Sequence, residues 1–260
     1  MRRRLVAVVA HPDDDTFGCS GTVALHADDP DLRFVLVHAT SGEAGMISDP
    51  LLATRETLGV VREEEDRRSW IALGREPDRH EFLRYPDSGL EDVPLEELVE
   101  RIGTILRDER PDVVMTFGPE GITGHADHIR VGEATTEAFH RCRVDGGDGF
   151  HRLLHVALAE TTLAEFSSRL VALGRDPIDP TQPFQPRAVP DGTIGVVVDC
   201  SSIVHRKQAA ILEHATQRND LSNIPAELEE EIFRFESHVI AWPQRSAGTP
   251  KLADVFEGLD

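Results

Sequence analysis

The chain has 260 residues, and its 47 aspartates and glutamates outnumber its 27 lysines and arginines, so the formal net charge is −20 with the 12 histidines neutral. This charge excludes a nucleic-acid or anionic-membrane surface as the expected partner, because binding phosphate needs clusters of basic residues. A hydrophobic content of 40% excludes a wholly disordered chain. A chain of this length buries enough surface for one sizeable core, and we expect one domain over residues 1–260.

The first apolar run follows three arginines, an arrangement also found in secretory signal peptides. The run Leu5–Ala10 has only six residues, whereas such a signal needs about 7–15 apolar residues. No stretch approaches the about 20 apolar residues of a membrane span. Cys19, Cys142 and Cys200 are widely spaced, which predicts reduced thiols. We therefore expect a cytoplasmic protein without a membrane span.

Short apolar runs alternate with amphipathic helical patterns along the chain. Strands are predicted at Leu5–Ala10, Arg33–Ala39, Val113–Phe117, Leu153–Ala159 and Ile194–Asp199. Helices are predicted near residues 17–27, 55–73, 95–109, 129–141, 163–173, 203–217 and 226–237. The first three strand candidates are almost continuously apolar, as strands buried on both faces are. The alternation predicts an α/β fold, with a Rossmann-like, mostly parallel sheet and helices on both faces.

A proline-rich segment, Gly174–Asp191, separates the last two strand candidates. Its prolines exclude a helix and predict an extended crossing segment: Pro177, Pro180, Pro183, Pro186 and Pro190. A plain connection is favoured over a lid. The tail after Trp242 has weak periodicity, and we expect it to be loosely ordered.

The strongest local pattern is AHPDDD at residues 10–15, directly after the first predicted strand. The carboxyl end of a parallel strand is the usual ligand-facing edge of an open α/β sheet. The carboxylates of this run repel one another, and a bound cation is the simplest compensation. An acidic helix cap is the competing explanation, and it suffices for Asp15. We interpret His11 and two of the aspartates as part of a metal site at this edge.

A second pattern, GITGHADH at residues 121–128, follows the predicted strand Val113–Phe117. His125 and His128 are three residues apart and share one face of a helical turn. With the first motif they make an open set of two imidazoles and one carboxylate, which is typical of catalytic zinc and compatible with iron(II). A third polar loop, TSGEAG at residues 40–45, also follows a predicted strand. The other histidines are interpreted as surface or hydrogen-bonded core residues: His38, His80, His140, His151, His155, His205 and His238.

The motifs AHPDDD, TSGEAG and GHADH, in this order, resemble those of the LmbE-like or PIG-L family of zinc-dependent N-acetylglucosamine deacetylases. That family includes the deacetylases and amidases of mycothiol metabolism. Three further stretches support the resemblance: the pattern R..E.......LG that begins at Arg62, the turn RYPDSG at residues 84–89, and KQAAILEHATQ at residues 207–217. The resemblance thus covers residues 5–217, and it implies an active site at the carboxyl ends of the strands.

The resemblance also implies a role for each polar residue of the two main motifs. The implied zinc ligands are His11, Asp14 and His128. Asp13 would be the general base toward a zinc-bound water, His125 would stand beside the scissile amide, and Asp127 would orient a histidine.

The substrate contacts follow less directly from the motifs. Glu43 and Asp87 can accept hydrogen bonds from sugar hydroxyls. Arg62 can reach a sugar hydroxyl or a phosphate, or it can pair with Glu65 or Asp66 on its own predicted helix. We expect Arg62, Glu43 and Asp87 to bind the substrate.

Two residues depart from the family pattern. The first motif usually ends in glutamate, and here it ends in Asp15. Members of the mycothiol pathway carry a tyrosine two places before the first histidine of the second motif, and this place is Thr123 here. An aromatic hydroxyl proposed to polarise the carbonyl is therefore absent, which weakens a mycothiol-specific assignment and leaves the metal ligands unaffected.

The predicted function is a metal-dependent hydrolase that removes an N-acetyl group from an N-acetylglucosamine-type sugar or glycoconjugate. Two alternatives stay open: a metal-dependent amidase for a non-sugar or thiol-conjugate amide, and a nucleotide-binding Rossmann module without hydrolysis. The last of these lacks a GxGxxG after the first strand. The expected partner is a small amino-sugar substrate and not a nucleic acid, and the oligomeric state stays open.

Overall fold

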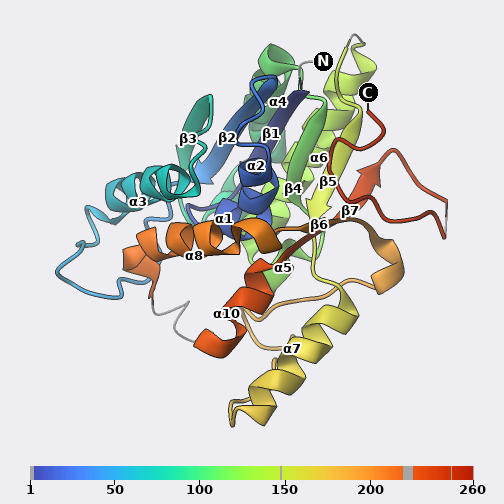
Figure 1. The fold of residues 1–260 in the computed structure, drawn as a ribbon. Coiled ribbons are helices and arrows are strands. Elements are labelled where there is room, and N and C mark those ends of the chain that lie inside the picture. Colours follow the sequence, from blue (N-terminus) through green and yellow to red (C-terminus); the bar gives the residue numbers. More distant parts are fainter. Residues whose placement is uncertain (1–2, 147, 219–224, 247, 260) are drawn as a thin grey trace.

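The structure is a computed structural model that describes residues 3–146, 148–218, 225–246 and 248–259. Within these residues, seven strands form one sheet in the order β3-β2-β1-β4-β5-β7-β6 (Figure 1). The strands are β1 (Arg3–Val9), β2 (Leu32–Thr40), β3 (Arg79–Tyr85), β4 (Val113–Phe117), β5 (Arg152–Val156), β6 (Ile194–Asp199) and β7 (Phe235–Trp242). The first five pair in parallel, and β7 is antiparallel to β5 and β6. The predicted mostly parallel α/β sheet is confirmed.

Helices cover both faces of the sheet, as predicted. They are α1 (Asp14–Gly18), α2 (Ser20–Leu25), α3 (Leu58–Leu73), α4 (Leu95–Glu109), α5 (Gly121–Gly124), α6 (Ala126–Val144), α7 (Glu160–Ala172), α8 (Val204–Glu213) and α10 (Ala226–Phe233). On one face α4 packs against α6, and on the other α2, α3 and α8 pack together (Figure 1). Among the described helices, none combines the length and apolar character that a membrane crossing needs.

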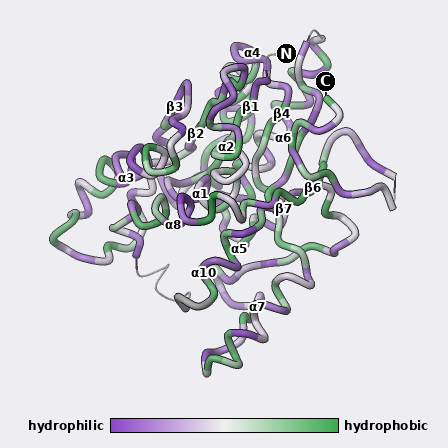
Figure 2. The backbone as a smooth tube through the Cα atoms, viewed as in Figure 1, coloured by the Kyte–Doolittle hydropathy of each residue, from purple (hydrophilic) through white to green (hydrophobic). Residues whose placement is uncertain are grey.

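The central strands lie in the core because their side chains are apolar on both faces. The run Leu5–Ala10 is fully buried, as are most residues of β2 and all of β4. Figure 2 shows the hydrophobic residues gathered along these strands. Strand β1 pairs with β2 on one side and β4 on the other, so the strand order reverses at β1. Ligands of open α/β sheets bind at such a switch point, beyond the carboxyl ends of the strands.

Two strands were not predicted, and one predicted helix is wrong at its end. Helix α10 ends at Phe233, and residues 235–242 form β7 instead of continuing the helix to 237. The buried positions early in β7 are Glu236 and His238, so a strand pattern of alternating apolar residues is absent. Strand β3, at the edge of the sheet, consists largely of polar residues and has no run of buried ones. Its sequence therefore also lacks a recognisable strand pattern.

Part of the tail after Trp242 packs on the core, although most of its described residues are exposed or half-buried. Val255 and Phe256 are buried in the core, and Arg152 donates hydrogen bonds to the carbonyl oxygens of Val255 and Glu257. Segment 174–191 is extended, as its prolines predicted, and it is pinned beside the end of β5 by a bridge between Ala159 and Val189.

Candidate active site

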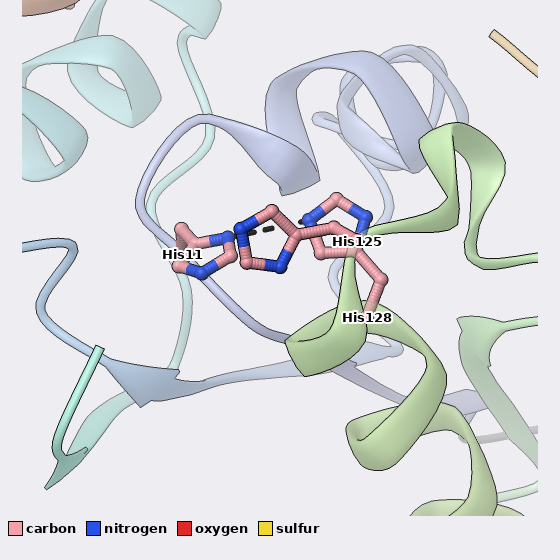
Figure 3. A group of neighbouring side chains, drawn as sticks. All are labelled: His11, His125 and His128. Carbon is pink, nitrogen blue, oxygen red and sulfur yellow. Dashed lines mark hydrogen bonds between the residues drawn. The ribbon is translucent and has the colours of Figure 1, made fainter. Parts of the chain in front are cut away.

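Two loops meet at the carboxyl edge of the sheet because β1 and β4 are neighbours. The loop after β1 carries His11, and the turn after β4 leads through α5 into α6, which begins with His125 as its N-cap residue. Figure 3 shows the imidazoles of His11, His125 and His128 converging on one another. One ring nitrogen of each lies within 4.8 Å of the other two. The fold therefore brings both main motifs into one site.

The side chains of His11, Asp14 and His128 form a triangle in this site, in which Asp14 contacts each histidine with a different oxygen. His11 Nδ1 lies 3.2 Å from His128 Nε2 and 3.2 Å from Asp14 Oδ2, and His128 Nε2 lies 3.2 Å from Asp14 Oδ1. A tetrahedral zinc with bonds of about 2.0–2.1 Å has ligand atoms roughly 3.3 Å apart. The spacing and the donor types of these residues therefore fit a zinc ion.

In His11 and His128, the ring nitrogen that faces away from the triangle lies next to a hydrogen-bond acceptor. The nitrogen that faces the triangle can therefore carry a lone pair. His11 Nε2 faces Asp87 Oδ1 at 3.0 Å and Asp127 Oδ2 at 3.3 Å. His128 Nδ1 donates to the carbonyl oxygen of Gly121 at 3.0 Å. Acceptors of this kind fix the tautomer of metal-binding histidines. His125 differs, because its Nδ1 accepts from the backbone N–H of Asp127 at 3.1 Å and caps α6.

The electrostatics of the site favour a positive charge at its centre. Burial alone would lower the pKa of His11, but the carboxylates of Asp127, Asp14 and Asp87 together raise it well above its usual value. Burial would raise the pKa of Asp14, but His128 and His11 hold it well below its usual value. The residues around the triangle thus stabilise a cation there, whether it is a proton or a metal ion.

Asp13 stands beside the triangle in an unusual conformation. Its φ is 107°, and non-glycine residues at such angles concentrate at functional sites because the fold must sustain the strain. Its carboxylate is 25% exposed and faces Arg62 Nη2 at 2.9 Å. Burial raises the pKa of Asp13 to about 7, against the opposing effect of Arg62. A carboxylate with this pKa is suited to accept a proton near neutral pH.

Arg62 contacts Asp13 and two backbone carbonyl groups. Its side chain is 5% exposed, and besides Asp13 it donates to the carbonyl oxygens of Pro12 and Gly42, at 2.6 and 2.8 Å. A Cβ atom at Gly42 would lie 2.2 Å from Arg62 Nη1, so a larger residue at this position would collide with the guanidinium. Within the described residues Arg62 pairs with Asp13 and not with Glu65 or Asp66 of α3, and its contact with a substrate stays a prediction.

Asp87 and Glu43 also contact protein groups. Besides contacting His11, Asp87 accepts the backbone N–H of Ala44 at 2.8 Å, and Glu43 accepts the backbone N–H of Asp87 at 2.9 Å. These bonds tie the loop after β2 to the turn after β3. Asp87 thereby helps to position His11, and sugar binding by the two carboxylates stays a prediction.

Asp127 is buried beneath His11, as the expected orienting role requires. Its oxygens accept the backbone N–H groups of Ser88 at 2.7 Å and Leu90 at 3.1 Å. The turn RYPDSG thus supports Asp127, a function that its sequence did not reveal. Asp15 lies in the first turn of α1, as an acidic helix end would, but its carboxylate also has partners far along the chain. It is fully buried, and its carboxylate accepts from the indole N–H of Trp70 at 2.7 Å.

Comparison with known proteins identifies the family. The profile described as GlcNAc-PI de-N-acetylase, PIG-L, matches residues 6–139, which include the first and second motifs. The chain belongs to the PIG-L family. The resemblance seen in the sequence is confirmed.

Several relatives of this PIG-L family protein are similar over most of their length. A 1D-myo-inositol 2-acetamido-2-deoxy-alpha-D-glucopyranoside deacetylase from Kineococcus radiotolerans is 33% identical over 251 residues, which cover 83% of this chain and 69% of the relative. The solved N,N'-diacetylchitobiose deacetylase from Pyrococcus horikoshii has a TM-score of 0.59 and 21% identity, and the match covers 92% of this chain and 83% of that chain.

A second solved structure of similar fold is named for a different reaction. The 4-carboxy-2-hydroxymuconate hydratase from Pseudomonas putida has a TM-score of 0.62 and 17% identity, and the match covers 95% of this chain and 100% of that chain. Likenesses at this identity show the fold alone, and this fold carries both a deacetylase and a hydratase. The fold alone therefore does not determine the reaction of this PIG-L family member, which depends on its site residues.

The proline-rich segment contributes two residues to the site that the sequence did not reveal. The ring of Phe184 lies 5.3 Å from the ring of His125, and Phe184 is 67% exposed with a φ of 58°. The guanidinium of Arg187 lies against Gly124, where a Cβ atom would be 2.0 Å from its Cζ. Segment 174–191 therefore passes beside the candidate site, with Phe184 next to His125. Its irregular composition carries no periodic signal that could have shown this.

Proposed function

We propose that this protein is a zinc-dependent hydrolase that removes the N-acetyl group from an N-acetylglucosamine-type sugar or glycoconjugate. The observation that carries the proposal is the triangle of His11, Asp14 and His128 with the carboxylate of Asp13 beside it. Two imidazoles and one carboxylate leave a position open for reaction, as catalytic zinc sites do. The deacetylase names of the relatives support the same reaction.

His11, Asp14 and His128 would hold the zinc ion, and iron(II) is compatible with the same ligands. A divalent ion at this place polarises an amide carbonyl and makes a water molecule acidic near neutral pH. We prefer Asp14 to His125 as the third ligand. Asp14 directs both oxygens at the two imidazoles, whereas His125 already uses one nitrogen to cap α6. Asp127 and Asp87 then orient His11 from behind.

Asp13 is the proposed general base. Its carboxylate accepts the proton of the attacking water, and Arg62 keeps that carboxylate facing the site through the 2.9 Å contact. A positioned base of this kind contributes about 10²–10⁴-fold to the rate. Once protonated, Asp13 is also the group that can return the proton to the departing amine.

His125 is the proposed donor to the developing oxyanion. Its Nδ1 accepts a backbone N–H, so its proton resides on Nε2, which is free to donate to the carbonyl oxygen of the amide. Burial lowers the pKa of His125, and the neighbouring His11 and His128 lower it further. The ring therefore donates as a neutral imidazole, and it leaves the protonation of the amine to Asp13.

The substrate would lie along Phe184, whose exposed ring offers an apolar face next to His125. Such a face suits the ring of a sugar or the apolar part of a conjugate. Three cysteines are free and buried: Cys19, Cys142 and Cys200. They support the proposed cytoplasmic location, because thiols stay reduced in the cytoplasm.

Acetate release from a panel of N-acetylated amino sugars, glycoconjugates and non-sugar amides tests the function. The zinc-loaded protein should release acetate from an N-acetylglucosamine derivative, and loss of zinc in His11→Ala or His128→Ala should abolish the release. His151→Ala is the matched control, because this histidine is half exposed and far along the chain from both motifs. Cleavage of non-sugar amides alone would favour the amidase. If the protein with full zinc occupancy cleaves none of the compounds, the proposed function is wrong.

A further inference from the structure

A second group of histidine and aspartate side chains lies at the β2–β3 edge of the sheet. His38 comes from β2, Asp66 from α3 and His80 from β3. Each offers a ligand atom within 4.8 Å of the other two. His38 and Asp66 are fully buried, and the side chain of His80 is 12% exposed. None of the three belongs to the proposed catalytic set.

His80 joins this group through two short contacts. His80 Nε2 lies 3.1 Å from Asp66 Oδ2 and 3.3 Å from His38 Nδ1, and the other nitrogen of His38, Nε2, lies 3.6 Å from Asp66 Oδ1. Two imidazole nitrogens and a carboxylate oxygen again converge from different elements. This donor set suits zinc and the neighbouring divalent transition metals.

The orientation of His38 also matches that of a metal ligand. Its outer nitrogen, Nε2, faces Asp15 Oδ1 at 3.1 Å, and the other oxygen of Asp15 accepts from Trp70 Nε1 at 2.7 Å. Because Asp15 is the acceptor, the proton of His38 lies on Nε2 and the lone pair on Nδ1 points toward His80. Asp15 therefore stands behind His38 as Asp127 stands behind His11.

Asp66 supplies the observation that calls for a ligand. It is fully buried, and neither carboxylate oxygen makes a hydrogen bond within the described residues, although His80 Nε2 lies 3.1 Å from one of them. A buried carboxylate without a hydrogen bond is unfavourable unless a cation compensates its charge.

We propose that His38, Asp66 and His80 form a second binding site for a divalent transition metal such as zinc. Asp66 can offer both oxygens, and His80 is the exposed ligand through which an ion enters from the sheet edge. The ion would tie β2, β3 and α3 together. The competing account is a proton on Asp66, since burial raises its pKa well above its usual value. The two accounts differ in the number of metal ions per chain.

Measuring the number of metal ions per chain distinguishes a bound ion from a proton on Asp66. Metal-free protein is titrated with Zn²⁺ alone, desalted, and analysed for zinc per chain. We expect about two ions in the wild type, one in His11→Ala, one in His80→Ala and none in the double variant, with two retained in His151→Ala. A single ion in the wild type that is lost in His11→Ala overturns the proposal, as does full retention in His80→Ala.

Thermal melting gives a readout that is independent of acetate release. In His11→Ala, added Zn²⁺ should raise the melting temperature, because the second site remains. His80→Gln in that background should abolish the rise, and circular dichroism checks that this variant is folded. Should His80→Ala fail to fold, His11→Ala alone decides the question through its zinc content. An unchanged melting temperature in His11→Ala would refute the site and leave the proposed hydrolase untouched.

Discussion

Replacing Asp13 with asparagine tests the proposed general base most directly, because the exchange removes the proton acceptor and little else. Asparagine has the shape of aspartate, and it too is enriched among residues of positive φ, which suits the φ of 107° at this position. Its amide oxygen can still accept the hydrogen bond that Arg62 Nη2 donates at 2.9 Å. The fold and the zinc content are therefore expected to stay those of the wild type.

The expected effect of Asp13→Asn lies in the chemical step. A positioned base contributes about 10²–10⁴-fold, so kcat should fall by that factor, equivalent to about 2.7–5.4 kcal/mol of transition-state stabilisation. Arg62 loses its counter-charge but keeps its bonds to the carbonyl oxygens of Pro12 and Gly42. KM should change little, because Asp13 is expected to contact the water and not the sugar.

The assay combines acetate release with elemental analysis of the same preparation. Asp13→Asn should retain zinc and lose turnover, whereas His11→Ala should lose both. A variant that keeps full zinc and turns over within about threefold of the wild type would remove Asp13 as the base. A loss of turnover that follows a loss of zinc would instead make Asp13 a support of the metal site.

Three further predictions concern the surroundings of the site and the core. Gly42→Ala should lower kcat with zinc retained, because the new Cβ would lie 2.2 Å from Arg62 Nη1. Gly174→Ala is the control, because Gly174 also has a positive φ but no atom within 4 Å of the added Cβ, and equal effects of the two variants on kcat would contradict the reasoning. Phe184→Ala should raise KM for the sugar by about 3–10-fold, the equivalent of roughly 1 kcal/mol of aromatic contact, and a change confined to kcat in steady-state kinetics would speak against a substrate wall. Burial would raise the pKa of Glu236, but the paired Lys207 lowers it below the usual 4.5. The ionised carboxylate therefore stabilises the folded protein fully above pH 4.5, and this stabilisation is lost as the pH falls through the pKa of Glu236 in the folded protein. Melting temperatures measured against pH should thus fall more steeply in the wild type than in Glu236→Gln, and parallel curves would refute this.

The sequence predicts the sheet well where strands are buried on both faces, and it fails where polar residues face inward. Leu5–Ala10 is recognisable because every residue is apolar. Strand β7 is hidden because Glu236 and His238 occupy its buried positions, where Glu236 accepts hydrogen bonds from α2 and pairs with Lys207. A polar side chain with a partner distant in the sequence is satisfied inside the protein. Local periodicity contains no information about that partner.

The same limit applies to the site. The convergence of His11, Asp14 and His128 follows from two motifs at the ends of adjacent strands, so local patterns together with the fold class could predict it. The partners of Arg62 and Asp87 could not be predicted, because they depend on how loops from β1, β2 and β3 pack together. In the structure each of them contacts another residue of the site, and their predicted binding of substrate is a separate question.

Three consecutive aspartates suggested a bound cation, because their charges repel one another. The structure shows that each of them has a separate compensating group: Asp13 faces Arg62, Asp14 faces two imidazoles, and Asp15 faces Trp70 and His38. Charge repulsion in the run is therefore not a sufficient reason for a metal. The stronger reason is geometric, since the inner lone pairs of two histidines and a carboxylate converge at 3.2 Å with their outer atoms already satisfied. Without a cation between them, these atoms would face one another unfavourably.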